Sequence, residues 1–192
     1  EVHIPRDASM FAFACLAAKA LGVNVKMGQL PEANDALGHE VLHDLLPSLG
    51  LKLTGTTLSP GDEGSHQTVD LRNANDLITP LAAIFALGQG GVIVGAMHAA
   101  YKETDRTVGT VNLLRQFGLE TTFNEGKLAV PGRQSVRPPS ELVETYGDHR
   151  MQMTALVLSL TCKRPERLRA AWTSRSWMRM LSLRTTRTGL LS

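Results

Sequence analysis

The stretch LLPSLGL at residues 45–51 recurs as LLRQFGL at residues 113–119, and the two glycines, Gly50 and Gly118, lie 68 positions apart. In each copy an apolar segment with helical spacing ends at the glycine, and a strand-like segment follows it. Similarity within one chain at a fixed long interval is typical of a repeated structural unit. The sequence therefore predicts an α/β fold built from repeats of this length.

Three aspartates support the repeat. Asp7, Asp76 and Asp148 each precede an apolar segment, at intervals of 69 and 72 residues. Aspartate often caps the first turn of a helix, so each is predicted to be an N-cap. Each unit reads as strand, buried helix, strand, amphipathic helix and two more strands. We expect residues 1–162 to hold two nearly complete units and the start of a third.

The expected elements follow from hydrophobic spacing and from turn residues. The pattern predicts a loop at 59–65 and, in the helix from 103, an apolar stripe through Val108, Val111, Leu114 and Phe117. Helices are expected at 8–21, 37–49, 76–87, 103–117 and 151–160, and strands at 23–27, 51–54, 68–71, 91–95, 119–123 and 127–130.

Composition narrows the class of protein. Of the 192 residues, 43% are hydrophobic and 20% are charged, as in soluble globular proteins, and no apolar run has the length of a membrane span. Cys15 and Cys162 give no disulfide framework, which favours a reducing cytoplasm. The chain opens without Met, which predicts a fragment or a processed chain.

The charge is unevenly distributed along the chain. The net charge of +2 combines −5 over residues 1–162 with +7 over residues 163–192. The repeat also ends near residue 162, so we expect a domain at 1–162 and an atypical basic tail at 163–192. The tail is interpreted either as sequence outside the native reading frame or as a solvated basic segment. A basic tail can also bind nucleic acid.

Two charged clusters point to chemistry. YKETDR at residues 101–106 and GDHRM at residues 147–151 both lie at the start of a predicted helix. Lys and Arg at helix starts suit a ligand that carries phosphate or carboxylate, and a nearby Glu or Asp can donate or accept a proton.

These clusters resemble those of the 5-enolpyruvylshikimate-3-phosphate synthases, the 3-phosphoshikimate 1-carboxyvinyltransferases. The resemblance covers about residues 1–160 and corresponds to the C-terminal lobe of a family member. It implies one lobe of the enolpyruvyl transferase fold, an inside-out α/β barrel of repeated βαβαββ units. The motifs that carry it are Asp7-Ala8-Ser9, Asp76-Leu77 with Leu81-Ala82-Ala83, His98 with residues 101–106, and residues 147–153.

Membership would imply transfer of the enolpyruvyl group of phosphoenolpyruvate to the 5-hydroxyl of 3-phosphoshikimate, with release of phosphate, in chorismate and aromatic amino acid biosynthesis. The resemblance implies no metal and no organic cofactor. The implied partners are these two small molecules and the other, N-terminal lobe, not nucleic acid or a membrane. We expect the 192 residues alone to be inactive.

The resemblance also implies roles for individual residues. Arg106 and Arg150 would clamp the anionic groups of phosphoenolpyruvate, although either could instead form a helix-surface ion pair. Glu103 would donate a proton to the methylene carbon. Asp76 would accept the proton of the attacking hydroxyl, with Asn75 as a competing position.

The remaining implied residues bind substrate or orient the site. Lys102 would contact the shikimate hydroxyl or neutralise charge, and His98 would lie beside that substrate. His149 lies next to Arg150 and is interpreted as a substrate-binding or structural residue. Asp105 and Asp148 would orient neighbours or cap helices.

Two alternatives remain at this stage. His39-Glu40-Val41-Leu42-His43 fits the His-Glu-x-x-His pattern, in which two histidines bind zinc and the glutamate acts as base, and so predicts a zinc hydrolase. The other alternative is a non-catalytic lobe that binds anions but has an incomplete active site.

Overall fold

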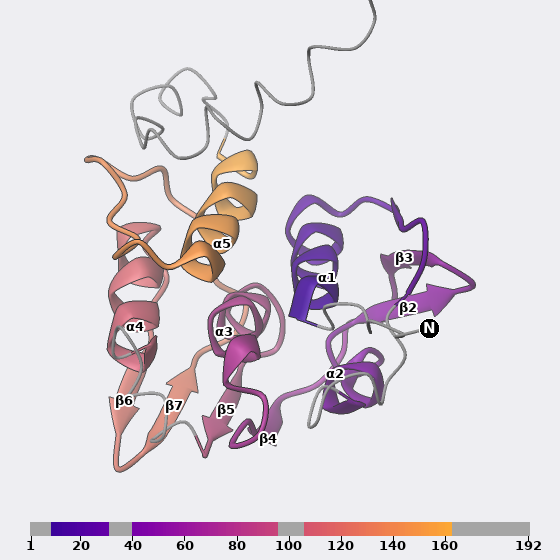
Figure 1. Cartoon of the computed structure of the whole chain (residues 1–192), viewed down its shortest axis with the longest axis horizontal. Helices are drawn as coiled ribbons and strands as arrows, with labels where there is room; N and C mark the ends of the chain where they lie inside the picture. The colour runs from indigo at the N-terminus through magenta and orange to yellow at the C-terminus, as the bar shows by residue number, and fades with distance from the viewer. Residues whose placement is uncertain (1–8, 31–39, 96–105, 163–192) are drawn as a thin grey trace, which may run out of the picture.

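The computed structural model describes residues 9–30, 40–95 and 106–162 (Figure 1). Asp7 and the predictions for the tail at 163–192 lie outside these residues, as do Asp105 and four further candidate residues: His39, His98, Lys102 and Glu103.

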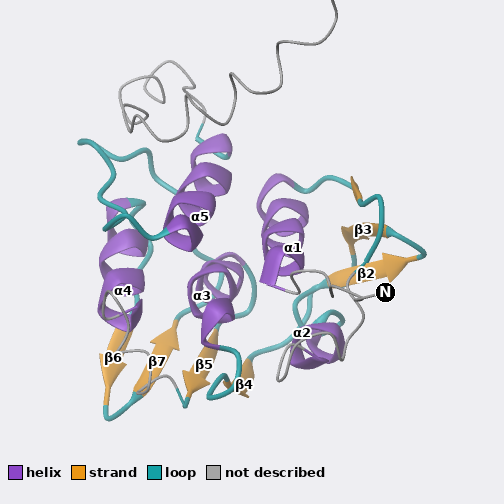
Figure 2. Ribbon diagram, viewed as in Figure 1, coloured by secondary structure: helices purple, strands orange, loops and turns teal. Residues whose placement is uncertain are grey.

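The described elements are helices separated by one or more strands along most of the chain (Figure 2). The helices are α1 (Ser9–Leu21), α2 (Glu40–Leu45), η1 (Asn75–Leu77, a 3-10 helix), α3 (Ile78–Leu87), α4 (Arg106–Gln116) and α5 (His149–Leu160). The strands are β1 (Val25–Lys26), β2 (Leu51–Thr54), β3 (Thr57–Pro60), β4 (Gln67–Asp70), β5 (Gly91–Val94), β6 (Thr122–Asn124) and β7 (Lys127–Val130).

The strand pairing repeats between the two units. One sheet has the order β1-β3-β2, and the other has the order β4-β5-β7-β6. In the first sheet the central strand β3 pairs antiparallel with β2 and with β1. In the second sheet β7 pairs antiparallel with β6 and with β5 in the same way. β4 adds a parallel strand beside β5. The repeat that was predicted from the sequence is therefore confirmed for the described residues.

The recurring stretch forms the same turn twice. Gly50 and Gly118 have φ angles of 70° and 71°, in the left-handed region that favours glycine. After each glycine a leucine N–H donates to a leucine carbonyl five residues earlier: Leu51 to Leu46 at 2.9 Å, and Leu119 to Leu114 at 3.0 Å. Each turn ends the outer helical segment and directs the chain back toward the core.

The core forms where the inner helices meet. α1, α3 and α5 pack against one another, and α3 also packs on β5 and β7 (Figure 1). Every residue of α3 from Ile78 to Ala86 is buried, which explains why this helix is apolar on all sides. Among the described helices, none has both the length and the hydropathy needed to cross a bilayer.

Several boundaries differ from the predictions. β3 occupies Thr57–Pro60 and overlaps the loop predicted at 59–65 at Ser59 and Pro60, because this segment completes the first sheet. The described part of the helix expected at 37–49 is the six-residue α2, followed by turns. The predicted stripe on α4 is wrong at Val108, which is 46% exposed, because Gly109, Thr110 and Leu113 face the core instead.

The capping predictions had mixed outcomes. Asp148 caps α5, since its Oδ1 accepts from the backbone N–H groups of Arg150 and Met151 at 2.7 and 3.3 Å. Asp76 is not an N-cap: η1 precedes α3, and neither start has a side-chain cap. The Asp76 carboxylate instead forms ion pairs with Arg106 and Arg150.

Candidate active site

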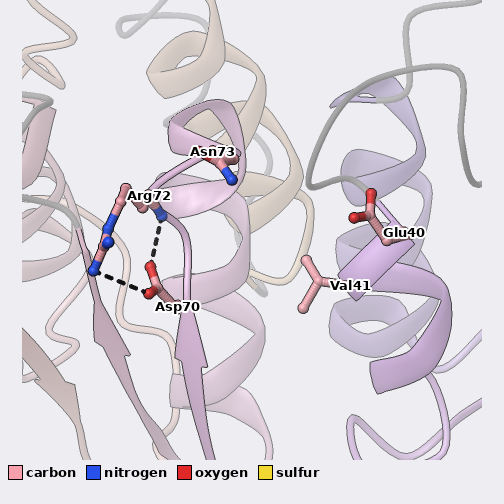
Figure 3. A pocket seen from close by; sticks show the side chains of 5 residues that line it. All are labelled: Glu40, Val41, Asp70, Arg72 and Asn73. Carbon is pink, nitrogen blue, oxygen red and sulfur yellow. Dashed lines mark hydrogen bonds and ion pairs between the residues drawn. The ribbon is translucent and has the colours of Figure 1, made fainter.

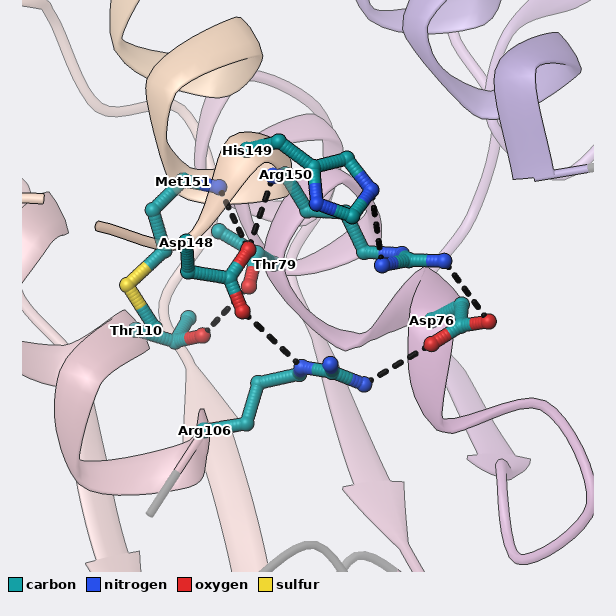
Figure 4. A network of polar contacts seen from close by, with 8 residues as sticks. All are labelled: Asp76, Thr79, Arg106, Thr110, Asp148, His149, Arg150 and Met151. Carbon is teal, nitrogen blue, oxygen red and sulfur yellow. Dashed lines mark hydrogen bonds and ion pairs between the residues drawn. The ribbon is translucent and has the colours of Figure 1, made fainter. Parts of the chain in front are cut away.

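The first turns of three helices converge on one cluster of charges (Figure 4). Asp76 lies in η1 immediately before α3, Arg106 is the first residue of α4, and Asp148 and Arg150 lie at the start of α5. These three helices pack against one another, so residues far apart in the sequence come together. Helix N-termini carry partial positive charge, which adds to the two arginines.

Arg106 is held by carboxylates on two sides. Its Nη1 donates to Asp76 Oδ1 at 2.8 Å, and its Nε lies 3.5 Å from Asp148 Oδ2. The side chain is only 8% exposed. A cation removed from water needs such partners, because an unpaired buried charge is strongly destabilising.

Arg150 shares one of these partners. Its Nη2 lies 2.9 Å from Asp76 Oδ2, and its Nη1 contacts His149 Nε2 at 2.8 Å. The Arg150 side chain is 14% exposed. Asp76 therefore uses one oxygen for each arginine and holds the two guanidinium groups side by side (Figure 4).

The arginines retain hydrogen-bonding capacity. Each guanidinium has five N–H donors, and within the described part of the chain the buried Arg150 Nε has no hydrogen-bond partner, while the Arg106 Nε faces Asp148 Oδ2 at 3.5 Å without forming a hydrogen bond. Paired guanidinium groups suit the oxygens of a carboxylate or phosphate. The arrangement can therefore bind an anion with more than one acceptor oxygen.

A buried hydrogen bond fixes the spacing of α3 and α4 next to the cluster. The hydroxyls of Thr79 and Thr110 lie 2.7 Å apart, and both residues are fully buried. Thr79 lies three residues after Asp76, and Thr110 lies one helical turn after Arg106. This contact ties together the helix starts that carry the Asp76–Arg106 pair (Figure 4).

The structure brings together four of the residues that were predicted to form a site: Asp76, Arg106, His149 and Arg150. Both arginines form ion pairs, as the alternative interpretation expected, but these pairs join different helices and the two side chains are only 8% and 14% exposed. Asp76 makes the contacts with the arginines, whereas the buried Oδ1 of the competing Asn75 has no hydrogen-bond partner among the described residues.

Two relationships were missed from the sequence. Asp148 was expected to cap or orient, but its second oxygen also faces Arg106 from another helix. The bridging position of Asp76 was likewise not expected, because the capping pattern suggested a different use of that carboxylate. No local spacing relates Asp148 to Arg106 or Asp76 to Arg150, because the members of each pair lie in different helical segments.

His43 of the zinc pattern has a packing role in the described structure. Its ring stacks on Phe11 of α1 with a centroid distance of 4.7 Å and an interplanar angle of 22°. Burial lowers the pKa of His43, and Asp44 partly opposes this shift. Within residues 9–30, 40–95 and 106–162, no group of three His, Cys, Asp or Glu could hold a metal ion.

A surface hollow is lined by residues outside the charge cluster. It has a volume of about 290 Å³ and is lined by Glu40, Val41, Asp70, Arg72 and Asn73, from the start of α2 and the end of β4 (Figure 3). Asp70 and Arg72 are exposed and pair with each other at 3.5 Å. Among the predicted site residues that the structure describes, only Glu40, the candidate base of the zinc pattern, lines this hollow.

Together, the fold and the charge cluster define an α/β lobe of repeated units with a pair of largely buried arginines where three helices begin. The family model for EPSP synthase (3-phosphoshikimate 1-carboxyvinyltransferase) matches residues 1–181, and the chain belongs to this family. The match continues past residue 162, and the domain boundary predicted there stays a prediction.

Similar proteins carry the same family name. The chain is 30% identical over 171 residues to a 3-phosphoshikimate 1-carboxyvinyltransferase of Methanocorpusculum labreanum, and 29% identical over 159 residues to one of Methanobrevibacter smithii. These alignments cover 83% and 80% of this chain but only 38% and 35% of the relatives. The chain thus spans well under half of their length.

A solved structure supports the fold. The structure of EPSP synthase from Acinetobacter baumannii aligns with a TM-score of 0.63 at 19% identity, covering 83% of this chain and 40% of that one. The expected fold class is therefore confirmed: the described residues form part of the enolpyruvyl transferase fold.

Proposed function

We propose that this chain supplies one lobe of a 3-phosphoshikimate 1-carboxyvinyltransferase. In the proposed reaction the 5-hydroxyl oxygen of 3-phosphoshikimate bonds to C2 of phosphoenolpyruvate, and the methylene carbon gains a proton. The tetrahedral intermediate then loses phosphate and a proton from the new methyl group, which restores the double bond. The product carries the enolpyruvyl group and enters chorismate and aromatic amino acid synthesis.

The observation that supports this proposal most is the pair of arginines, 8% and 14% exposed, that Asp76 bridges in a chain of this family. Phosphoenolpyruvate carries a carboxylate and a phosphate close together, and two adjacent guanidinium groups can offer paired donors to both. The surrounding low exposure strengthens such contacts because little water competes.

The proton-transfer roles are assigned to carboxylates. Asp76 accepts the proton of the attacking hydroxyl. Its carboxylate lies between Arg106 and Arg150, and substrate can reach it because the side chain is 30% exposed. Glu103 donates the proton to the methylene carbon. Glu103 lies three residues before Arg106 in the sequence, outside the described residues.

Three further residues are assigned to substrate binding. Lys102 contacts the shikimate hydroxyl or offsets negative charge, and His98 lies beside the same substrate; both are outside the described residues. His149 contacts Arg150 at 2.8 Å and orients that guanidinium from the same helix start.

We propose further that turnover needs a second, N-terminal lobe and that the protein works in the cytoplasm. The alignments cover well under half of the relatives' length, which leaves room for another lobe. Both cysteines, Cys15 and Cys162, are buried and free, as is usual in a reducing compartment.

The test is phosphate release from 3-phosphoshikimate and phosphoenolpyruvate, measured with the chain alone and with the N-terminal lobe of the M. labreanum relative supplied separately. Release that needs both parts and is lost in Glu103→Gln supports the proposal. Phosphoenolpyruvate binding without turnover, with the supplied lobe shown to be bound, would point instead to a non-catalytic anion-binding lobe.

A further inference from the structure

A side-chain clasp joins the end of α4 to the loop that leads into α5. Gln116 is the last residue of α4. Its Oε1 accepts from the Glu144 N–H at 2.7 Å, and its Nε2 donates to the Glu144 carbonyl at 3.2 Å. The amide thus pairs with both polar groups of one backbone residue, as a neighbouring strand would.

The clasped loop ends in a tight turn just before the site. Asp148 N–H donates to the Thr145 carbonyl at 2.9 Å, and the two central residues, Tyr146 and Gly147, have φ angles of 52° and 73°. Positive φ at both central positions is characteristic of a type I′ turn. It suits Gly147, but for Tyr146 it is an unfavourable conformation that surrounding contacts must hold.

Those contacts again come from α4 and the clasped residue. Tyr146 N–H donates to Glu144 Oε1 at 2.7 Å, and Asn112 Nδ2 donates to the Tyr146 hydroxyl at 3.3 Å. Asp148 is the last residue of this turn, and it caps α5 with one carboxylate oxygen and faces Arg106 with the other. The strained turn is therefore fixed by contacts with α4 before it and by the Asp148–Arg106 contact at its end.

Helix α4 consequently contacts the cluster in two ways, directly through Arg106 and indirectly through the loop before α5. α4 begins with Arg106 and ends with Gln116. Gln116 is hydrogen-bonded to Glu144, in the loop that ends at Asp148 just before Arg150. We propose that Gln116 is a positioning residue: through the Thr145–Asp148 turn it sets where Asp148 and Arg150 lie relative to Arg106. The inference rests on the proposed function only in that phosphoenolpyruvate is the ligand of the arginines.

A second glutamine provides a matched control. Gln134 clasps Glu120 in the same manner, accepting from its N–H at 2.6 Å and donating to its carbonyl at 3.0 Å. Gln134 lies in the same β7–α5 connection, but its clasp is 14 residues before Asp148 and holds Glu120 after the end of α4, whereas the Gln116 clasp holds Glu144, four residues before Asp148. Gln116→Met and Gln134→Met each remove a clasp of the same kind together with one further amide contact, to the Asn112 or the Pro131 carbonyl, and only the Gln116 clasp adjoins the Thr145–Asp148 turn.

The experiment uses the full chain and both variants, with thermal unfolding, calorimetric titration with phosphoenolpyruvate, and the NMR signal of the Arg150 Nε–H. Both variants should lose similar stability. Gln116→Met alone should shift the Arg150 signal and weaken phosphoenolpyruvate binding roughly tenfold, as expected when a misplaced guanidinium loses a charged hydrogen bond. Gln116→Glu, which can still accept from Glu144 N–H, should restore part of the affinity.

The outcomes separate the two proposals. Equal phosphoenolpyruvate affinity and an unchanged Arg150 signal in Gln116→Met would overturn the positioning role. If even the wild-type chain does not bind phosphoenolpyruvate, the proposed function is in question, and the Arg150 signal still decides the inference. If Gln116→Met does not fold, the same comparison is made with Gln116→Glu, whose Arg150 signal must differ from that of the wild type.

Discussion

Asp76 and Arg106 form an ion pair of 2.8 Å between the start of one helix and the start of another. The other oxygen of Asp76 lies 2.9 Å from Arg150, so one carboxylate connects α3 with both α4 and α5. The residue proposed to accept a proton is thus also the residue that holds the two proposed clamps together. Substitutions at this cluster should affect both stability and ligand binding.

Replacing Asp76 by Asn keeps the size of the side chain but removes its charge. Arg106 would keep only the longer contact with Asp148, and a side chain that is 8% exposed would lose its closest anionic partner. We expect Asp76→Asn to lower the free energy of unfolding by roughly 2 kcal/mol, less than for a fully buried pair because Asp76 is 30% exposed. Urea denaturation measures this change.

Asp70→Asn is the matched control for that substitution. Asp70 pairs with Arg72 at 3.5 Å, and both side chains are exposed. Exposed pairs contribute little, so the change should stay within about 0.5 kcal/mol. Equal losses in the two variants would mean that the Asp76 cluster behaves as an ordinary surface pair.

Two substitutions at Asp148 separate its capping role from its charge. Asp148→Ser can still cap α5 but cannot pair with Arg106, whereas Asp148→Ala loses both contacts. We expect Asp148→Ala to be less stable than Asp148→Ser by about 1 kcal/mol, the usual value of an N-cap. Chemical denaturation of both variants tests this, and identical stabilities would argue against the cap.

The Thr79–Thr110 pair should show non-additive energetics. Thr79→Val leaves the Thr110 hydroxyl buried without this 2.7 Å partner, and Thr110→Val does the reverse. Each single variant should lose about 1–2 kcal/mol, and the double variant should lose less than the sum, because it leaves no unpaired hydroxyl. A double-mutant cycle of unfolding free energies measures the coupling, and strict additivity would contradict it.

His43 should make stability depend on pH. Burial against α1 lowers the pKa of His43 below its ordinary value of 6.5, and Asp44 opposes this only partly. As the pH falls through 6.5, the unfolded chain therefore takes up a proton before the folded chain does, and stability decreases. Above that pH both states are neutral at this residue, and the effect vanishes.

His43→Phe is the variant for this test, because it can keep the ring stacked on Phe11. The difference in unfolding free energy between wild type and variant, measured across the acidic range, should shift against the wild type as the pH falls. A difference that does not change with pH would show that His43 makes no such contribution.

The repeat and the order of elements could be predicted from the sequence because they depend on local signals. Glycine at a left-handed turn recurs at Gly50 and Gly118, and the buried α3 is apolar on all sides. β3 was missed because Ser59 and Pro60 favour turns locally, whereas pairing with β2 decides the outcome.

The site was only partly predictable. Arg106, Arg150 and Asp76 stand out as charges at helix starts, but their mutual contacts depend on how α3, α4 and α5 pack. The same packing decides that Asp76 bridges arginines and does not cap a helix, and that Gln116 reaches Glu144 across 28 residues of sequence. No local pattern encodes these relationships.

The most direct measurement is an NMR titration of the labelled chain with phosphoenolpyruvate, followed through the arginine Nε–H signals. The account predicts that the signals of Arg106 and Arg150 shift and saturate, while those of the exposed Arg72 and Arg133 stay in place. If the Arg106 and Arg150 signals do not move at millimolar ligand, or if all four arginines shift in parallel, the Arg106–Arg150 pair is not the phosphoenolpyruvate clamp.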